Sequence, residues 1–179
     1  MNINELKYGI KYFFANSIIT HIPSWTIRKR LFKLIGMKIG KSHILRGVVT
    51  DGWNGIVIRN GVCINQRCHI DGRGGLIIED NVSISIGTVI LSASHDKDSS
   101  DFKYTTRTVH IGKRVWLGAN CIVLPGVDLS EGVVIAAGSV AIPQKYEKFG
   151  VYSGVPAVKI SDRSMNITYD LSSWDPILR

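Results

Sequence analysis

The chain has 179 residues, of which 45% are hydrophobic, and its formal net charge is +8. This length suits one domain with a sizeable core, and the hydrophobic content with scattered charge excludes a disordered chain. The basic charge predicts an anionic partner such as a phosphorylated small molecule or a membrane surface, whereas the absence of RNA-binding and helix-turn-helix patterns argues against nucleic acid.

The cysteines and the N-terminus indicate a reducing compartment. The chain has three cysteines, an odd number, and Cys68 and Cys121 fall on interior positions of the repeat described below. They therefore read as small core residues, not as a disulfide framework or a metal site. The N-terminus lacks a signal-peptide cleavage pattern, and its longest apolar stretch, 12–22, is too short to span a bilayer. We expect a cytoplasmic protein.

Residues 1–36 predict an N-terminal helical cap built from two helices. Asn2 is suited to cap a first helix that runs to about Ser17. Pro23 then opens a second helix, which stops at Gly36.

The second helix combines an apolar stripe with a basic face. The stripe consists of Trp25, Leu31, Phe32, Leu34 and Ile35, and the residues expected toward solvent are Arg28, Lys29, Arg30 and Lys33. Such a helix either lies on a membrane surface or covers the exposed strand edges of the first repeat. We expect it to act as a cap, and we leave peripheral membrane contact open beside that role.

The centre of the chain follows a six-residue period, which is neither a helical nor a strand period. One set of residues recurs every six positions through 111–141, and a second compact residue follows four positions after each of the first five. The first set is Ile111, Leu117, Val123, Leu129, Ile135 and Ala141, and the second is Val115, Cys121, Val127, Val133 and Ser139. A hexapeptide repeat indicates a parallel β-helix, in which each coil buries its inner row against the next.

The same period occurs upstream, with Ile58, Ile64 and Ile70 in one register and Ile78, Ile84 and Ile90 in another. The eight-residue step from Ile70 to Ile78 predicts a corner bulge at 72–75, and 50–55 is irregular enough to be a loop around Trp53. The 21-residue step from Ile90 to Ile111 predicts a long loop over 92–108. Because loops on rigid scaffolds often carry function, we look for chemistry there.

The repeat pattern ends after Pro143. We therefore expect a β-helix over 37–143 and a C-terminal turn and tail over 144–179, with a turn at 154–157. Trp174 is expected to anchor the tail against the body.

Several ordered motifs accompany the repeat. They are Ile64-Asn65-Gln66-Arg67, Ile78-Glu79-Asp80-Asn81-Val82, Ser94-His95-Asp96, the run from Ile111 to Gly118, Leu124-Pro125-Gly126-Val127 and Gly154-Val155-Pro156-Ala157. Over about residues 36–160 the chain resembles the hexapeptide-repeat acyltransferases, and most of all the sugar and polysaccharide O-acetyltransferases that include the maltose and galactoside enzymes. The resemblance implies a mainly β fold: a left-handed parallel β-helix with a short N-terminal helical segment and an extruded loop.

The resemblance also implies a homotrimer with its active sites between neighbouring subunits, acetyl-CoA as the acyl donor and no metal. The basic charge suits the phosphates of CoA, which Lys and Arg bind readily. A zinc carbonic anhydrase shares this fold and needs three histidine ligands, with a pair five residues apart. This chain has no histidine pair at that spacing.

His95 is the predicted catalytic residue. Acetyl transfer from a thioester to a hydroxyl needs a base, and imidazole has a suitable pKa near neutrality. His95 lies 30 residues after Asn65, which matches the family's separation between its acceptor-site asparagine and its catalytic histidine. Asp71 is a second acceptor-site candidate, although the bulge after Ile70 blurs its alignment. The alternatives are a solvated loop histidine, a corner asparagine and a solvated aspartate.

Candidate contacts for the cofactor lie later in the chain. By resemblance they are Trp116, Gly118, Ala119, Ala136, Ala137, Lys145 and Lys159. Trp116 should face outward, and the small residues either let the pantetheine arm approach the backbone or simply satisfy tight coils. Where the family commonly has a Thr-Lys pair this chain has Ile142 and Pro143, so Lys145 and Lys159 are basic substitutes out of register.

These features together predict an acetyl-CoA-dependent O-acetyltransferase that modifies a sugar hydroxyl by direct transfer, in the synthesis of a surface polysaccharide. Two alternatives remain open. One is N-acetylation of an amino-sugar nucleotide or of a drug acceptor, and the other is a non-catalytic β-helix module used for assembly.

Overall fold

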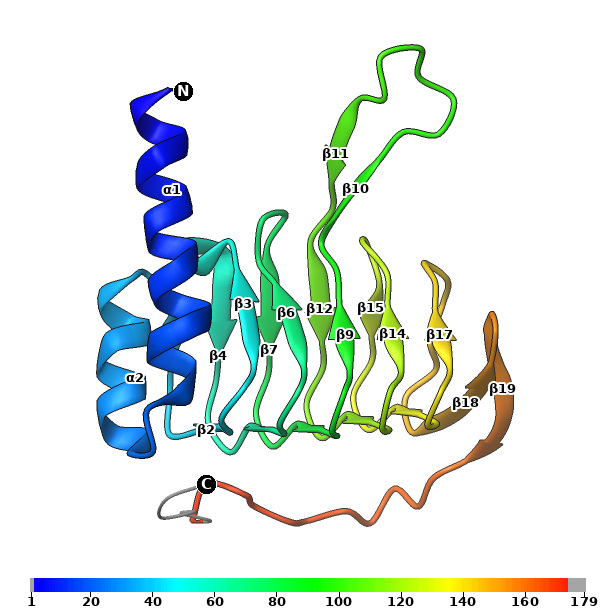
Figure 1. Ribbon diagram of the computed structural model, residues 1–179. Helices are drawn as coiled ribbons and strands as arrows, with labels where there is room; N and C mark the ends of the chain where they lie inside the picture. Colours follow the sequence, from blue (N-terminus) through cyan, green and yellow to red (C-terminus); the bar gives the residue numbers. More distant parts are fainter. Residues whose placement is uncertain (1, 174–179) are drawn as a thin grey trace.

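The chain begins with helices that stand at one end of the molecule (Figure 1). The structure is a computed structural model that describes residues 2–173. The helical elements are α1 (Ile3–Phe13), the π-helical turn η1 (Phe14–Ile18), the 3-10 turn η2 (Ile19–His21), α2 (Trp25–Leu34) and, further on, the 3-10 turn η3 (Trp53–Gly55). The predicted N-cap is confirmed, because the Asn2 side chain accepts a hydrogen bond from the Asn4 N–H at 3.1 Å. The first helix is α-helical only to Phe13, and the π-helical turn replaces its expected last turn.

α2 packs on the first coil of the β-helix through Trp25 and Phe32, which are both buried. The predicted stripe is wrong at Leu34, which is 80% exposed. The predicted basic face is wrong at Arg28, which is completely buried. Arg28 tolerates burial because its guanidinium donates hydrogen bonds to main-chain carbonyls, including that of Ile44 in the first coil at 2.9 Å.

Five coils follow within residues 38–141, and each contributes one short strand to each of three parallel sheets (Figure 1). The first sheet contains β1 (Lys38–Ile39), β4 (Ile56–Ile58), β7 (Leu76–Ile78), β12 (Val109–Ile111) and β15 (Asp128–Leu129). The second contains β2 (His43–Ile44), β5 (Cys63–Ile64), β8 (Ser83–Ile84), β13 (Trp116–Leu117) and β16 (Val134–Ile135). The third contains β3 (Val49–Asp51), β6 (His69–Asp71), β9 (Val89–Ile90), β14 (Ile122–Val123) and β17 (Val140–Ala141).

The predicted inner rows form the core. Ile64 lies opposite Ile84, Ile84 opposite Leu117, and Leu117 opposite Ile135, and all four are fully buried. Each inner side chain therefore covers the one in the preceding coil, as the six-residue period requires.

Cys68 and Cys121 are core residues, as predicted. Cys68 and Cys121 are buried on inner positions, Cys63 is partly buried, and all three are free thiols. Burial raises the pKa of each thiol to about 11, so these thiols are poor nucleophiles near neutral pH.

The segment 50–55 is more ordered than a loop. β3 extends to Asp51, and η3 follows directly. Trp53 is buried, with its indole N–H donating to the Thr50 hydroxyl at 2.9 Å. The tryptophan thus closes the corner of the first coil instead of projecting from it.

The β-helix continues past Pro143, which corrects the prediction that it ends there. β18 (Gly150–Gly154) pairs in parallel with β16, and Tyr152 lies buried opposite Ile135. An aromatic residue fills the inner position at a step of 17 residues, so an aliphatic six-residue period does not detect it. β18 then pairs antiparallel with β19 (Ala157–Asp162), which confirms the turn at 154–157, whereas Trp174 lies outside the described residues.

Two neighbouring isoleucines, one on the inner row and one facing outward, allow a test of how much the inner row stabilises the fold. Ile78 on β7 is fully buried, whereas Ile77 on the same strand faces outward and is partly exposed. We expect Ile78→Ala to lower the free energy of unfolding by about 2–5 kcal/mol, and Ile77→Ala to lower it by less than half as much. Denaturant titration of both variants measures the difference, and equal losses would contradict the inner row.

Candidate active site

The long loop is an antiparallel hairpin that projects from the coils (Figure 1). It consists of β10 (Ala93–His95) and β11 (Tyr104–Thr106), and His95 pairs with Tyr104 at the outer end of the ladder. The Arg107 N–H donates to the Ser92 carbonyl at 2.9 Å and closes the base of the hairpin. The predicted excursion is therefore confirmed, but it is held by a short ladder that the six-residue period does not indicate.

The His95 ring is exposed and oriented by its neighbours. Its Nδ1 lies 2.8 Å from the main-chain oxygen of Phe102, and its ring stacks on the Phe102 ring with 4.0 Å between centroids. A carbonyl oxygen only accepts hydrogen bonds, so Nδ1 carries the proton in this geometry. Nε2 of the neutral ring is then left with a free lone pair.

A cavity of about 380 Å³ lies beside the hairpin. Its lining includes His95 and Arg107 from the hairpin, Pro125 from the turn after β14, and Pro143. The cavity thus joins the exposed imidazole and a cationic side chain to the later coils. This is room for part of a cofactor or for a small acceptor.

The other predicted site residues lie on a different edge of the β-helix. We call the turns after β2, β5, β8, β13 and β16 the small-residue edge, and the turns after β3, β6, β9, β14 and β17 the hairpin edge. Asn65 lies on the small-residue edge and is partly exposed, and so do Gly118, Ala119, Ala136 and Ala137. One side of the prism, about six residues or roughly 20 Å long, separates the two edges.

The small residues on this edge stack closely. The Gly118 N–H donates to the Ile135 carbonyl at 2.8 Å, and the Gly138 N–H donates to the Ala119 carbonyl at 2.9 Å. A Cβ on Gly118 would lie 2.5 Å from the Ala137 nitrogen. Coil stacking alone therefore requires glycine at 118, and the small side chains of the turns after β13 and β16 leave the backbone accessible on that part of the edge.

Asp71 is a buried member of an ion pair. Its carboxylate accepts hydrogen bonds from the Arg73 guanidinium at 2.9 Å and from the Ser92 N–H at 3.1 Å. Burial by itself would raise the pKa of this carboxyl, but these hydrogen bonds outweigh it and hold the pKa below its ordinary value. Asp71 thus ties the 72–75 corner to the base of the hairpin, and a role in acceptor binding stays a prediction.

The remaining cofactor candidates are dispersed. Trp116 faces outward as predicted, is 47% exposed, and donates its indole N–H to the Ser85 hydroxyl at 3.1 Å. Lys159 forms ion pairs with Glu147 at 2.7 Å and Asp162 at 2.8 Å, and these raise its pKa. Lys145 is exposed. None of the three lines the cavity beside the hairpin.

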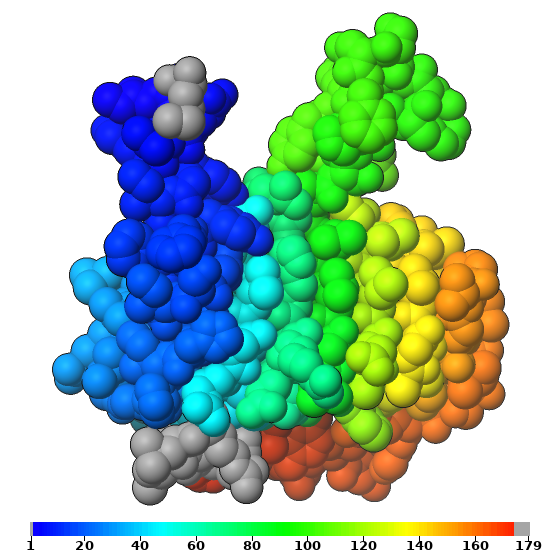
Figure 2. Space-filling model, viewed as in Figure 1, coloured from blue at the N-terminus to red at the C-terminus, as the bar shows by residue number. Residues whose placement is uncertain are grey.

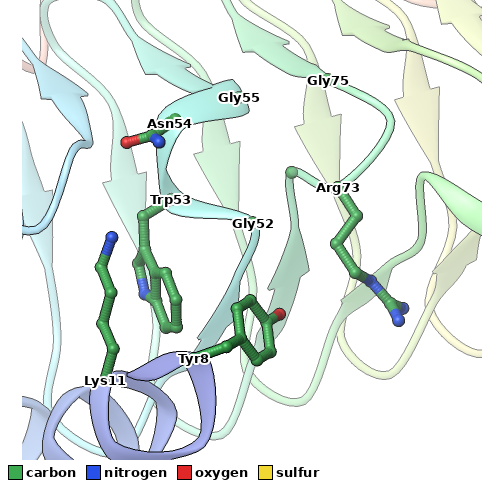
Figure 3. A pocket seen from close by; sticks show the side chains of 9 residues that line it. Tyr8, Lys11, Gly52, Trp53, Asn54, Gly55, Arg73 and Gly75 are labelled. Atoms are coloured by element: carbon green, nitrogen blue, oxygen red, sulfur yellow. The ribbon is translucent and has the colours of Figure 1, made fainter. Parts of the chain in front are cut away.

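A second cavity, of about 430 Å³, lies between α1 and the hairpin edge, and sequence reasoning missed it (Figure 3). Tyr8 and Lys11 reach into it from α1, on either side of Trp53, and Arg73 lines it from the next corner. The Tyr8 hydroxyl donates to the Asp51 carboxylate, which also lies 3.4 Å from the Arg73 guanidinium. The six-residue period does not indicate this cavity, because α1 and the 52–55 turn lie outside the repeat. The glycine-rich bulge at 72–75 was the one feature of the sequence that pointed to an unusual corner there.

Metal ligands do not cluster in the part of the chain that the structure describes. Within residues 2–173 no group of three His, Cys, Asp or Glu side chains is placed to hold a metal ion.

The stacked coils and the extruded hairpin define a class: left-handed parallel β-helix proteins built from hexapeptide repeats. Residues 108–140 match the family model described as the hexapeptide repeat of succinyl-transferase. Among solved structures, a maltose O-acetyltransferase from Clostridium difficile superposes with a TM-score of 0.82, at 21% identity over 91% of this chain and 90% of that one. A hexapeptide-repeat acetyltransferase from Vibrio cholerae, solved with acetyl-CoA, gives 0.77 at 20% identity over 91% of each chain.

Two curated relatives come from Escherichia coli. An acyltransferase of dTDP-4-amino-4,6-dideoxy-D-glucose is 36% identical over 131 residues, which is 67% of each chain. A protein assigned to colanic acid biosynthesis as an acetyltransferase is 27% identical over 164 residues, which is 89% of each chain. This chain belongs to the hexapeptide-repeat acyltransferase family and is an acyltransferase.

Asp71 offers a test of the ion pair that holds the hairpin base. Because its folded-state pKa is depressed, Asp71 stabilises the fold above its unfolded pKa of 3.8, and this contribution is lost as pH falls toward the folded-state pKa. We expect Asp71→Asn to lower the free energy of unfolding by about 1–3 kcal/mol at pH 6 and by clearly less at pH 3.

The measurement is denaturant titration of wild type and variant at both pH values. Asp98→Asn is the control, because Asp98 is 78% exposed and should cost little at either pH. A loss for Asp71→Asn that is the same at pH 6 and pH 3 would show that the ionised carboxylate is not what stabilises this corner.

Proposed function

We propose that this acyltransferase transfers an acetyl group from acetyl-CoA to a sugar hydroxyl, with His95 as the general base. The observation that carries the proposal is the 2.8 Å contact between His95 Nδ1 and the Phe102 carbonyl, which leaves Nε2 free beside the hairpin cavity. The acetyl-CoA complex of the Vibrio cholerae structure supports the choice of donor.

The reaction needs no covalent enzyme intermediate. Nε2 of His95 takes the proton of the acceptor hydroxyl while the hydroxyl oxygen attacks the thioester carbonyl. The resulting tetrahedral species collapses with cleavage of the C–S bond, and the imidazolium returns its proton to the CoA sulfur. The Phe102 carbonyl holds the ring through Nδ1 in both states, since Nδ1 remains a donor throughout. Backbone N–H groups would stabilise the oxyanion.

We infer that each active site forms between two copies of the chain. His95 lies on the hairpin edge, whereas Asn65 and the Gly118 to Ala137 backbone lie on the small-residue edge. In a ring of copies joined by a heterologous contact, the hairpin edge of each copy can face the small-residue edge of its neighbour. A homotrimer of triangular prisms meets this requirement, and it would bring His95 of one copy to Asn65 of the next.

In this arrangement the pantetheine arm lies along the small-residue edge, where backbone groups are accessible between Gly118, Ala119, Ala136 and Ala137. Arg107 in the hairpin cavity is a further cation for the CoA phosphates. Lys145 is free to join it, whereas Lys159 must leave Glu147 and Asp162 first. We place the enzyme in the cytoplasm, in keeping with its three free thiols.

The proposed acceptor is a sugar unit of a surface polysaccharide or its precursor. The relative assigned to colanic acid biosynthesis, matched over most of both chains, supports this class. The cavity between α1 and the hairpin edge has the Lys11 ammonium and the Arg73 guanidinium on its walls as hydrogen-bond donors for sugar oxygens.

A second candidate function is N-acylation of an amino sugar linked to a nucleotide. It is favoured by the relative that acylates dTDP-4-amino-4,6-dideoxy-D-glucose, which is more identical to this chain over a shorter stretch. The same base serves both reactions, because an amine also loses a proton when it is acylated.

We expect His95→Ala to lower the turnover number by about two to four powers of ten, because the base is lost while the proposed CoA contacts on the small-residue edge are unchanged. Steady-state kinetics with acetyl-CoA measures turnover, and calorimetric titration with CoA should show little change in affinity. His21→Ala is the matched control, since His21 is an exposed residue in the N-terminal helical segment. Near-normal turnover in His95→Ala would remove this residue from the mechanism.

Paired acceptors separate the two functions. With hexoses and nucleotide-linked hexoses, each offered beside its amino-deoxy counterpart, we expect the larger kcat/KM for the hydroxyl acceptor. A preference for the amine would establish the second candidate instead. If calorimetry detects no CoA binding at all, the chain is a β-helix assembly module and both enzymatic proposals fail.

A further inference from the structure

The N-terminal helix exposes its apolar face. None of the side chains of α1 is buried. Its first turns stand clear of the coils (Figure 2). A stripe at helical spacing, which we call the α1 stripe, consists of Ile3, Leu6, Ile10, Phe13 and Phe14. These side chains are 43–66% exposed, and five large apolar groups in one row are more than the single exposures common on protein surfaces.

The opposite face of α1 makes the contacts with the protein. Tyr8 bonds to Asp51, and its ring lies 5.6 Å from that of Trp53. Lys11 places its ammonium 4.7 Å from the Trp53 ring, as Figure 3 shows from the side of the cavity. Tyr8 and Ile10 are two residues apart, which is about 200° around a helix. The polar and aromatic face therefore docks, and the α1 stripe points away from the coils.

The excess positive charge of the chain is concentrated in the same region. Residues 1–46 hold nine of the 22 Lys and Arg residues and one of the 14 acidic residues, so their formal charge is +8. The remaining 133 residues are neutral overall. This segment contains the N-terminal helices and the first two strands of the first coil, β1 and β2, which lie together at one end of the molecule (Figure 1).

We propose that this end binds an anionic lipid surface, with the α1 stripe inserted among the headgroups and the exposed lysines and arginines of residues 1–46 facing the lipid phosphates. An amphipathic helix with aromatic and aliphatic residues on one side and cations nearby has this chemistry. Within residues 2–173 no helix is long and apolar enough to cross a bilayer, so the helix lies on the surface. Leu34 and Ile27 of α2 are further exposed apolar side chains in the helical segment.

A second copy of the chain fits this face less well. An isologous contact through the α1 stripe would bring two segments of charge +8 together, and this repulsion opposes pairing. An anionic membrane instead gains from the same charge, at about 1 kcal/mol for each Lys or Arg near the surface. The proposal is independent of the acyl-transfer proposal, because it involves the face of α1 turned away from both cavities.

The test is sedimentation of the full-length protein with lipid vesicles. Vesicles of phosphatidylcholine alone are compared with vesicles that contain equal parts phosphatidylglycerol. We expect binding only to the anionic vesicles, a decrease with added salt, and a loss of at least about tenfold in Ile10→Glu/Phe13→Glu. Because the replaced side chains are exposed, circular dichroism and the melting temperature should match wild type.

Two control pairs separate location from composition. Val155→Glu/Ile160→Glu changes two exposed apolar residues at the other end of the molecule. Its reference is Lys113→Gln/Lys148→Gln, which changes the net charge by the same amount, and we expect the two variants to bind vesicles within about twofold of each other. Arg30→Gln/Lys33→Gln, which removes two exposed cations from α2, should weaken anionic binding several-fold more than that reference.

Other outcomes would overturn the proposal. Absence of wild-type binding to the phosphatidylglycerol vesicles, or equal binding by wild type and Ile10→Glu/Phe13→Glu, would each reject a lipid surface as the partner. If the same substitutions split the assembly in light scattering while wild type ignores vesicles, the α1 stripe is a contact between copies. If the wild-type protein binds the anionic vesicles but transfers no acetyl group to any sugar acceptor, the lipid proposal stands and only the proposed acetyl-transfer reaction is rejected.

Discussion

The structure depends on the stacking of one inner side chain on the next along each face of the β-helix. Ile64, Ile84, Leu117 and Ile135 lie in consecutive coils, paired strand to strand and fully buried. No coil can bury its own row, so each coil is stable only between its neighbours. The ends then need covers, which α2 supplies through Trp25 and Phe32 at one end and Tyr152 on β18 at the other.

The corners of this scaffold vary more than its sheets. A corner can lose its side chains, as at Gly118, or lengthen into a hairpin, as at His95. In this chain the two modifications lie on different edges. The cavity beside His95 and the backbone around Gly118 therefore lie apart in one protomer, and for this reason the proposed active site needs a neighbouring copy. The α1 stripe and the +8 charge lie at a third place, the N-terminal end.

The coils could be predicted well because each coil needs an apolar inner residue at a fixed spacing along the chain. The predicted inner-row residues, from Ile58 in the second coil through Ala141 in the last, are all buried. The predictions failed where the position of a side chain depends on a residue far away in the sequence. Arg28 lies on the expected basic face but is buried, and its guanidinium donates to the Ile44 carbonyl in the first coil. Tyr152 fills an inner position that does not follow the six-residue period. The hairpin could be predicted as an excursion, but the orientation of the His95 ring could not, because it depends on the fold of Phe102 across the hairpin. The cavity between α1 and the hairpin edge could not be predicted, because it is lined by one helix and two corners that lie apart in the sequence and none of them alone indicates a cavity.

Co-expression of two inactive variants tests most directly whether the site is shared between copies. His95→Ala and Asn65→Ala, carrying different tags, are each first shown to be inactive alone, and the mixed assembly is then purified through both tags. If His95 of one copy works with Asn65 of the next, random cyclic trimers should recover about a quarter of the wild-type sites, and purification through both tags should raise that share. Activity no greater than that of the separate variants would contradict a site formed between two edges.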